Sequence, residues 1–313
     1  MNEGSESVQV VRRLDIEFAS EQGGLMCRGW FYPVPRDDAP VIVMAHGLGG
    51  VKEMRIDAYA ERFAEEGYAC LAFDYRHFGA SDGQPRRIIE VRRQLADWRS
   101  AVAHVRSIRP NSQIVLWGSS LAGGHVLTVA ASDGRVAAVI SQCPHTSGPA
   151  AVRQLSLRTI ARVAALGLCD IGAKLLGKGS VVVPLAAPAD QLALMNTPGN
   201  YATASELLAT AGSAAPPNAV AAGIGITIGA YSPGRHAREL RCPVLFCLCT
   251  KDNVAPAGVA KQYAQQASRP SIFEYPFGHF DIYMGTAFEK VIVDQIRFLR
   301  RHVPAAMPPV LPL

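Results

Sequence analysis

Charged and aromatic residues are scarce in this chain: of its 313 residues, 18% are Asp, Glu, Lys or Arg and 7% are Phe, Trp or Tyr. The apolar fraction of 49% is high enough for a core, so the composition excludes an intrinsically disordered chain. The net charge is only +5, and the basic residues form no dense stripe of the kind that binds nucleic acid. We therefore expect a soluble globular protein with no nucleic-acid partner.

Signals for export, membrane insertion and disulfide bonding are also missing. The first ten residues, MNEGSESVQV, have neither a basic nor an apolar region, and the weakly charged stretches further on are broken by Pro and Gly. The seven cysteines are an odd number without a CxxC pair, which argues against a disulfide framework and a zinc site. We predict a cytoplasmic protein that spans no membrane and binds no metal, and we interpret Cys242, Cys247 and Cys249 as core residues.

Short apolar runs alternate with helical patterns along most of the chain. Two strand-like stretches, VQVVRRLDIEF and LMCRGWFYPV, flank the turn signal Gln22-Gly23-Gly24 and predict an antiparallel hairpin. The later alternation predicts an α/β fold with a mostly parallel central sheet and helices on both faces. The predicted strands are 41–46, 68–74, 114–118, 136–141, 243–249 and 271–276, and the predicted helices are 53–66, 88–108, 121–132, 257–267 and 286–302.

Residues 145–236, called the insertion below, interrupt this alternation. From Gly179 to Gly234 the only charged side chains are Asp190 and Glu206. A segment of this length is not a plain loop in a compact domain, and the run LSLRTIARVAALGL predicts a helix. We therefore predict a core domain from residues 1–144 and 237–303, an inserted helical cap from 145–236, and an extended tail over 304–313.

The run WGSSLAGG at 117–124 lies between a predicted strand and a predicted helix, which is the context of the nucleophile elbow G-x-S-x-G. The residues two before and two after the nucleophile must be small, because strand and helix approach closely there. Centring the motif on Ser120 places Gly118 and Ala122 at these positions, whereas centring it on Ser119 places a Trp and a Leu there. Ser120 is therefore the candidate nucleophile, although Ala122 replaces the second Gly of the usual motif.

HGLGG at 46–50 follows an earlier predicted strand and matches the HG-x loop that supplies an oxyanion-hole amide in such folds. A developing alkoxide needs preorganised hydrogen-bond donors. We predict that these donors are the backbone N–H groups of Leu48 and of Leu121, the residue after the nucleophile.

A serine nucleophile needs a base, and the base needs an orienting carboxylate. In the order Ser, acid, His, the candidates are Asp252, directly after the strand 243–249, and His279, after the strand 271–276. Both lie at the carboxyl ends of strands, where the active sites of parallel sheets assemble. Asp281, Asp294, Glu289 and His302 are weaker candidates.

Side chains near these motifs have structural interpretations. His46 is expected to fix its loop by hydrogen bonding, and Asp74, Tyr75 and Arg76 to brace a neighbouring loop, with Arg76 engaging a carboxylate. His145 is expected either to line the mouth of the pocket or to have a structural role. No motif supports a role for His77, His104, His125 or His236.

Together, the stretches AHGLGGVKEM, FDYRHFGASDG and WGSSLAGGHV resemble the α/β-hydrolase superfamily, over about residues 10–145 and 236–302. The narrower branch includes dienelactone-hydrolase-like and X-Pro-dipeptidyl-peptidase-like hydrolases and fungal polyketide transferases. A nucleophilic Ser differs from the Cys of dienelactone hydrolase proper and from the Asp of epoxide and haloalkane hydrolases. The resemblance implies a cap, no cofactor, and the following roles: nucleophile Ser120, acid Asp252, base His279, oxyanion amides Leu48 and Leu121.

These residues predict a serine hydrolase that cleaves a small-molecule carboxylic ester or thioester through an acyl-enzyme. Acyl transfer with the same triad is the alternative, followed by amide cleavage and by a non-catalytic binding protein. The sequence leaves the substrate and homo-oligomerisation open. Apolar side chains of the insertion are expected to line an acyl pocket or, as the alternative, to pack the insertion against the core domain: Leu185, Leu192, Leu194, Met195, Ile224, Ile226 and Ile228.

Overall fold

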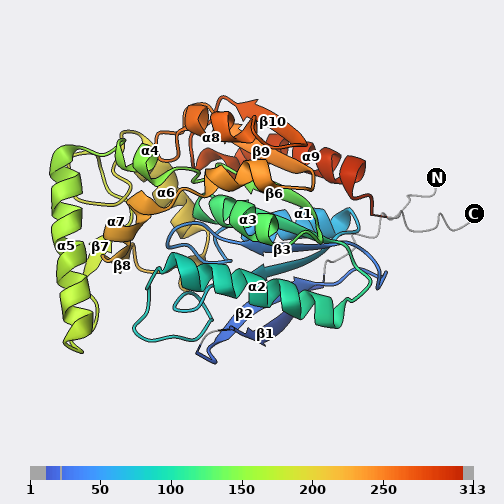
Figure 1. The fold of residues 1–313 in the computed structure, drawn as a ribbon, viewed down its shortest axis with the longest axis horizontal. Coiled ribbons are helices and arrows are strands. Elements are labelled where there is room, and N and C mark those ends of the chain that lie inside the picture. The colour runs from blue at the N-terminus through green and yellow to red at the C-terminus, as the bar shows by residue number, and fades with distance from the viewer. Residues whose placement is uncertain (1–11, 22, 306–313) are drawn as a thin grey trace, which may run out of the picture.

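A computed structural model describes residues 12–21 and 23–305. Its central element is an eight-stranded sheet in the order β1-β2-β4-β3-β5-β6-β9-β10 (Figure 1). Only β2 runs against its neighbours, so the predicted mostly parallel sheet and the N-terminal antiparallel hairpin are confirmed. The strands are β1 Leu14–Ala19, β2 Met26–Tyr32, β3 Val41–Ala45, β4 Ala69–Phe73, β5 Ile114–Ser119, β6 Val136–Gln142, β9 Val244–Cys249 and β10 Pro270–Tyr275.

Helices cover both faces of this sheet, as predicted. The α1 and α9 helices pack against each other, and α2 packs against α3. Two predicted helices start too early: Ile88 and Ile89 are buried before α2 begins, and α1 begins at Ile56 after a turn. The core helices are α1 Ile56–Glu65, α2 Val91–Ile108, α3 Leu121–Ser132, α8 Ala257–Ala264 and α9 Gly285–His302.

The strand register brings the carboxyl ends of the parallel strands to one edge. Ala45 lies beside Gly118, and Ser119 lies beside Gln142. On the other side of β6, Cys249 at the end of β9 lies beside Tyr275 at the end of β10. The loops that follow β3, β5, β9 and β10 carry all the predicted site residues and therefore emerge together.

Two of the strands that end at this edge, β3 and β9, are completely apolar. All five residues of β3 and all six of β9 are buried, as expected for strands covered on both faces. Cys242, Cys247 and Cys249 are buried with them, and their thiols are free. The rigid core thus holds the loops above it in fixed positions.

The insertion lies at one end of the molecule and is not purely helical (Figure 1). Its entry and exit are joined, because Gly148 N–H donates to the Tyr231 carbonyl at 2.9 Å and Gly234 N–H donates to the Thr146 carbonyl at 2.9 Å. The long helix predicted from LSLRTIARVAALGL is present as α5. The elements are α4 Gly148–Val152, α5 Leu157–Leu175, β7 Val182–Pro184, α6 Asn200–Ala209, β8 Ala219–Ala221 and α7 Ile224–Thr227, with 3₁₀ turns at Gly212–Ala214, Ile228–Ala230 and Pro233–Glu239.

The division into a core domain and a separate cap remains a prediction, and most of the predicted tail, 306–313, lies outside the described residues. Within the part of the chain that the structure describes, no helix is both long and apolar enough to cross a bilayer.

Candidate active site

Ser120 occupies a sharp turn between β5 and α3, with φ of 58° and ψ of −119°. A non-glycine residue with positive φ is strained, and such strain persists only where the surroundings impose it. The Ser120 N–H is fixed by a 2.9 Å hydrogen bond to the Gln142 carbonyl. A Cβ on Gly118 would lie 2.2 Å from the Ala122 carbonyl oxygen, so only glycine fits at that position. Ala122 is fully buried, and its small side chain fits where the usual motif has glycine.

The structure brings together the three side chains selected from the sequence. His279 Nε2 lies 2.9 Å from Ser120 Oγ, and His279 Nδ1 lies 2.5 Å from Asp252 Oδ2. Since a carboxylate only accepts, Nδ1 carries the proton and Nε2 is the acceptor that faces the serine hydroxyl. The imidazole and the carboxylate are each only 1% exposed. The arrangement can therefore remove the hydroxyl proton in a site shielded from water.

Asp252 is held on its second oxygen as well. The backbone N–H groups of Val254 and Ala255 both donate to Asp252 Oδ1 at 2.8 Å. The weaker candidate Asp281 instead accepts from the Gly278 N–H at 2.7 Å and braces the loop that carries His279. The other weaker acids are engaged elsewhere: Glu289 pairs with Arg62, and Asp294 with Arg297 and Tyr275.

The loop after β3 lies directly against the nucleophile. A Cβ on Gly47 would lie 2.7 Å from Ser120 Cβ, so the backbone can approach this closely only at a glycine. The N–H groups of Leu48 and Leu121 donate no hydrogen bond to any other described residue. Such free donors beside the serine are what an oxyanion would require.

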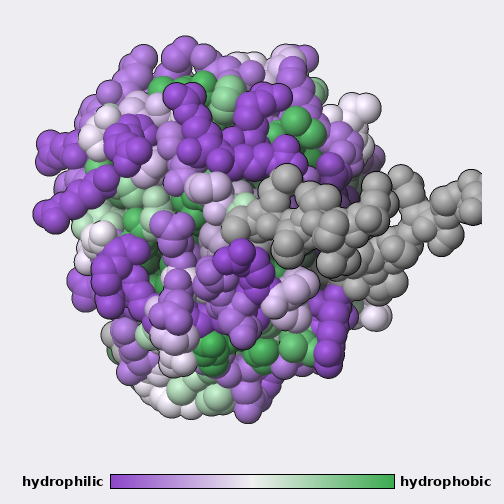
Figure 2. All heavy atoms as spheres, turned by 90° about the vertical axis from the view of Figure 1, so that its right-hand side faces the viewer, coloured by the Kyte–Doolittle hydropathy of each residue, from purple (hydrophilic) through white to green (hydrophobic). Residues whose placement is uncertain are grey.

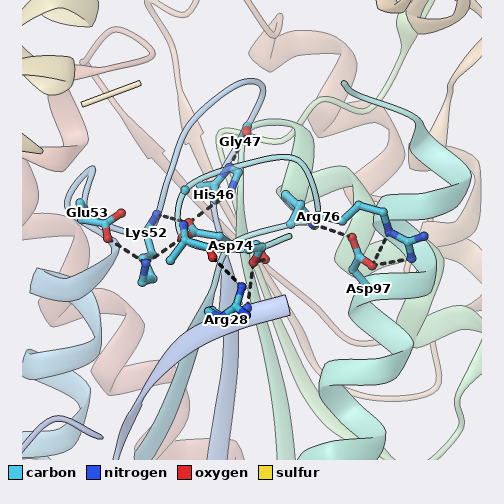
Figure 3. A network of polar contacts seen from close by, with 12 residues as sticks. Arg28, His46, Gly47, Lys52, Glu53, Asp74, Arg76 and Asp97 are labelled. Atoms are coloured by element: carbon cyan, nitrogen blue, oxygen red, sulfur yellow. Dashed lines mark hydrogen bonds and ion pairs between the residues drawn. The ribbon is translucent and has the colours of Figure 1, made fainter. Parts of the chain in front are cut away.

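A buried ionic cluster supports this loop from below (Figure 3). Asp74 accepts from the Lys52 N–H at 2.8 Å and from Lys52 Nζ at 2.7 Å. His46 Nδ1 lies 3.0 Å from the Gly47 carbonyl, while its Nε2 lies 3.8 Å from Asp74 Oδ1. Burial lowers the pKa of His46 below its usual value. His46 therefore fixes the loop as a neutral side chain, in the structural role expected for it.

Arg76 forms a second cluster beside the first, as Figure 3 shows. Its Nε and Nη2 donate to Asp97 Oδ1 at 2.9 and 2.6 Å, and both side chains are buried. The expected engagement of a carboxylate by Arg76 is present, and the partner comes from α2. The pair anchors the loop that follows β4 to that helix.

An apolar cavity of about 120 Å³ opens beside Ser120 and continues under the insertion. Four of the seven residues expected to line an acyl pocket do so: Leu194, Met195, Ile224 and Ile228. Helix α5 contributes further wall residues that the sequence did not single out, namely Ile160, Val163 and Ala164.

The expectation for Leu185, Leu192 and Ile226 is wrong, since none of them lines this cavity. Leu185 packs against the loop after β3, where a Cβ on Gly49 would lie 2.4 Å from its Cδ1. Leu192 packs against the core, and Ile226 is 37% exposed beside α5. Their direction is set by the irregular path of the insertion, which no periodic pattern reveals.

A smaller cavity of about 40 Å³ also borders the nucleophile. Ser120, Leu48 and Met195 line both cavities, whereas Met54, Leu207 and Phe280 are among the residues that line only the smaller one. The serine therefore lies between a larger and a smaller cavity. Such an arrangement fits a substrate with two unequal arms.

Two further histidines contact Tyr231, which lies near the end of the insertion. His125 Nδ1 lies 2.8 Å from the Tyr231 hydroxyl and its Nε2 3.0 Å from Gln94 Oε1, while His145 Nε2 lies 3.2 Å from the Tyr231 carbonyl. Burial lowers the pKa of His125 to about 3 and that of His145 to about 4. His145 also lines the larger cavity, as expected.

Sequence reasoning missed Asn253, which links the acid loop to the insertion. Its Oδ1 accepts from Thr197 Oγ1 at 3.0 Å and from the Asn200 side chain, and its Nδ2 donates to the Pro198 carbonyl at 2.9 Å. Both Asn253 and Thr197 line the larger cavity. The only signal in the sequence was the position of Asn253 directly after Asp252.

Comparison with known proteins agrees with this architecture. The family model described as serine aminopeptidase, S33, matches residues 37–276. The chain belongs to this family of α/β-hydrolases. It is 46% identical over 295 residues to the quorum-quenching protein AidA of Acinetobacter baumannii, an alignment that covers 93% of this chain and 95% of that protein.

Relatives with named activities include hydrolases and transferases. The thiohydrolase aneE of Aspergillus aculeatus is 28% identical over 305 residues, covering 91% of this chain and 92% of its own. The crystal structure of the α/β-hydrolase GrgF from a Penicillium species has a TM-score of 0.77 at 25% identity and covers 93% of this chain and 99% of its own. The chain is thus a member of a serine hydrolase family that contains esterases, thiohydrolases and transferases.

Proposed function

We propose that this protein hydrolyses a carboxylic ester or thioester through an acyl-enzyme formed on Ser120. The observation that carries this proposal is the continuous hydrogen-bonded chain from Ser120 Oγ through His279 to Asp252, which opens into an apolar cavity. The three side chains come from loops that are far apart in the sequence. This series of hydrogen bonds is the arrangement that activates a serine hydroxyl.

In the first step His279 Nε2 takes the proton of Ser120 as Oγ attacks the acyl carbonyl carbon. The carbonyl oxygen becomes an oxyanion that the N–H groups of Leu48 and Leu121 stabilise. His279 then protonates the departing alcohol or thiol, and the acyl group stays on the serine. A water molecule, deprotonated by the same imidazole, releases the acid and restores the hydroxyl. Asp252 keeps the imidazole in the required tautomer throughout.

The larger cavity supports an apolar acyl group as the substrate's longer arm. Much of its wall is formed by aliphatic side chains of the insertion, which thus acts as a lid over the acyl chain. The smaller cavity then receives the leaving group. A relative named as a thiohydrolase supports a thioester as one member of the substrate class.

Acyl transfer to an alcohol, amine or thiol is the second candidate, because relatives include polyketide transferases, one of them 26% identical over 305 residues. The same acyl-enzyme serves both reactions, and the exclusion of water decides between them. The smaller cavity beside Ser120 is the place where an acceptor would compete with water.

The test is a panel of p-nitrophenyl esters and acyl thioesters, run with and without alcohol, amine and thiol acceptors. We expect free acid as the main product and covalent labelling by a fluorophosphonate, with both lost in Ser120→Ala. If the main product is instead the acylated acceptor, the protein is an acyltransferase and the proposed hydrolysis is wrong. Absence of labelling in the folded wild type would indicate a binding protein without this chemistry.

A further inference from the structure

Helix α5 carries an apolar stripe that faces solvent. Leu157, Leu168 and Leu175 are 85%, 63% and 84% exposed. They are eleven and seven positions apart, which at about 100° per residue places them within about 20° of one line along the helix. The stripe is therefore about 27 Å long at a rise of about 1.5 Å per residue.

The other face of α5 is used inside the molecule. Ile160 and Val163 line the larger cavity, and Gly167 approaches the backbone of Ala222, where a Cβ would lie 3.1 Å from its carbonyl oxygen. One face of α5 thus packs against the rest of the protein, and the opposite, exposed face is also apolar. In Figure 1 it forms the outer edge of the insertion, beyond the ends of the central sheet.

The exposed apolar side chains are concentrated here and not scattered over the surface. Of the ten large hydrophobic residues that are exposed among those described, five lie on α5 or at its end and three elsewhere in the insertion. Figure 2, which views the opposite end of the molecule, shows a mainly hydrophilic surface there. Single exposed apolar residues are ordinary, whereas a contiguous patch marks an interaction surface. The five are Leu157, Leu168, Ile171, Leu175 and Leu176.

The exposed charge on the segment that carries the stripe has one sign. Arg153, Arg158, Arg162 and Lys178 are exposed, and none of them forms an ion pair with another described residue. The only acid between Arg153 and Lys178 is Asp170, which is fully buried and paired with Lys174 at 2.7 Å. The segment from Arg153 to Lys178 therefore exposes four unpaired cations and no carboxylate.

An apolar stripe beside unbalanced basic residues is typical of a helix that lies in the headgroup region of an anionic membrane. A second copy of the chain fits less well, because pairing two α5 helices would bring like charges together.

We propose that α5 docks the protein on the surface of an anionic lipid bilayer, with the stripe in the acyl boundary and the four cations at the headgroups. The docked helix would hold the larger cavity, which lies behind it, close to the bilayer, where apolar substrates concentrate. The docking is independent of the hydrolysis proposed above.

The test measures sedimentation of the full-length protein with phosphatidylcholine vesicles that contain or lack phosphatidylglycerol, at low and high salt. We expect binding that needs the anionic lipid and weakens with salt. Leu168→Glu/Leu175→Glu should abolish it. Arg158→Gln/Arg162→Gln should weaken partitioning roughly 25-fold, at about fivefold per basic residue.

The matched control is Val293→Glu on α9, an exposed apolar residue outside the insertion, which should bind like the wild type. Ser120→Ala should also bind normally, so that failure of docking and failure of the proposed hydrolysis are distinguishable. Equal binding to neutral vesicles, or equal loss in the control, would overturn the proposal. A dimer detected by light scattering and dissociated by Leu168→Glu would also overturn the proposal, because the stripe would then bind a second copy of the chain.

Discussion

The hydroxyl groups of Ser119 and Tyr283 lie 2.5 Å apart in the core, one residue before the candidate nucleophile. Gln142 Nε2 also donates to Ser119 Oγ at 3.2 Å, and Gln295 Nε2 donates in turn to Gln142 Oε1 at 2.7 Å. Of the two adjacent serines, one thus belongs to a buried polar network that ties β5, β6 and α9 together, and the other faces the cavity. Burial raises the pKa of Tyr283, which keeps its hydroxyl protonated in this network.

We therefore expect Ser119→Ala to keep fluorophosphonate labelling while lowering the free energy of unfolding. The loss should be about 1–3 kcal/mol, because Tyr283 and Gln142 each lose a buried partner. Labelling kinetics and denaturant unfolding measure the two effects. If Ser119→Ala alone removed labelling from a folded protein, the assignment of the nucleophile to Ser120 would be wrong.

Asp252→Asn should lower kcat by up to roughly 10⁴-fold, because an amide no longer holds His279 in the tautomer that accepts the serine proton. Asp281→Asn is the control. It weakens one hydrogen bond to the Gly278 N–H and should leave most of the activity. Steady-state kinetics on a single p-nitrophenyl ester compares the two, and the reverse order of effects would reassign the acid.

The preference for acyl-chain length should follow the larger cavity. Each buried methylene favours binding by up to about 0.8 kcal/mol, so kcat/KM should rise from acetyl to medium-chain esters and then fall. Val163→Phe places a larger side chain in the larger cavity and should shift the optimal acyl-chain length to shorter chains. Val182→Phe, at an exposed position in β7, is the control. A steady decline from acetate upward in the wild type would exclude the acyl-pocket assignment.

Asn253→Ala should raise KM more than it lowers kcat. The substitution removes the hydrogen bonds that attach the insertion to the acid loop, while the backbone donors of Val254 and Ala255 still hold Asp252. Asn218→Ala, which loses hydrogen bonds to Ala186 within the insertion, is the control. If the substitution lowers only kcat, Asn253 instead helps to orient the acid Asp252.

Stability should fall as the pH is lowered from about 6.5 toward 4. His125 and His145 have pKa values of about 3 and about 4 in the folded protein, below the usual 6.5, so the unfolded chain binds more protons in this range. Each histidine contributes a slope of up to about 1.4 kcal/mol per pH unit. His125→Gln should remove one such slope from the unfolding free energy measured between these values. An unchanged slope would show that His125 is not buried in its neutral form.

The sequence alone determined the parts of this protein that depend on local or repeating patterns. Buried strands read as apolar runs because both faces of the sheet are covered, and the elbow at Ser120 requires small neighbours within two residues. Chain order then sufficed to select Asp252 and His279, because parallel strands deliver their loops to one edge.

Tertiary structure decided whatever depends on contacts between irregular segments. Leu185, Leu192 and Ile226 belong to the same apolar insertion as Leu194 and Ile224, yet only the latter two line the cavity. The bonds from Asn253 to the insertion join residues more than fifty positions apart. Such contacts leave no periodic trace, because the direction of a side chain in a loop follows from the packing around it and not from its sequence neighbours.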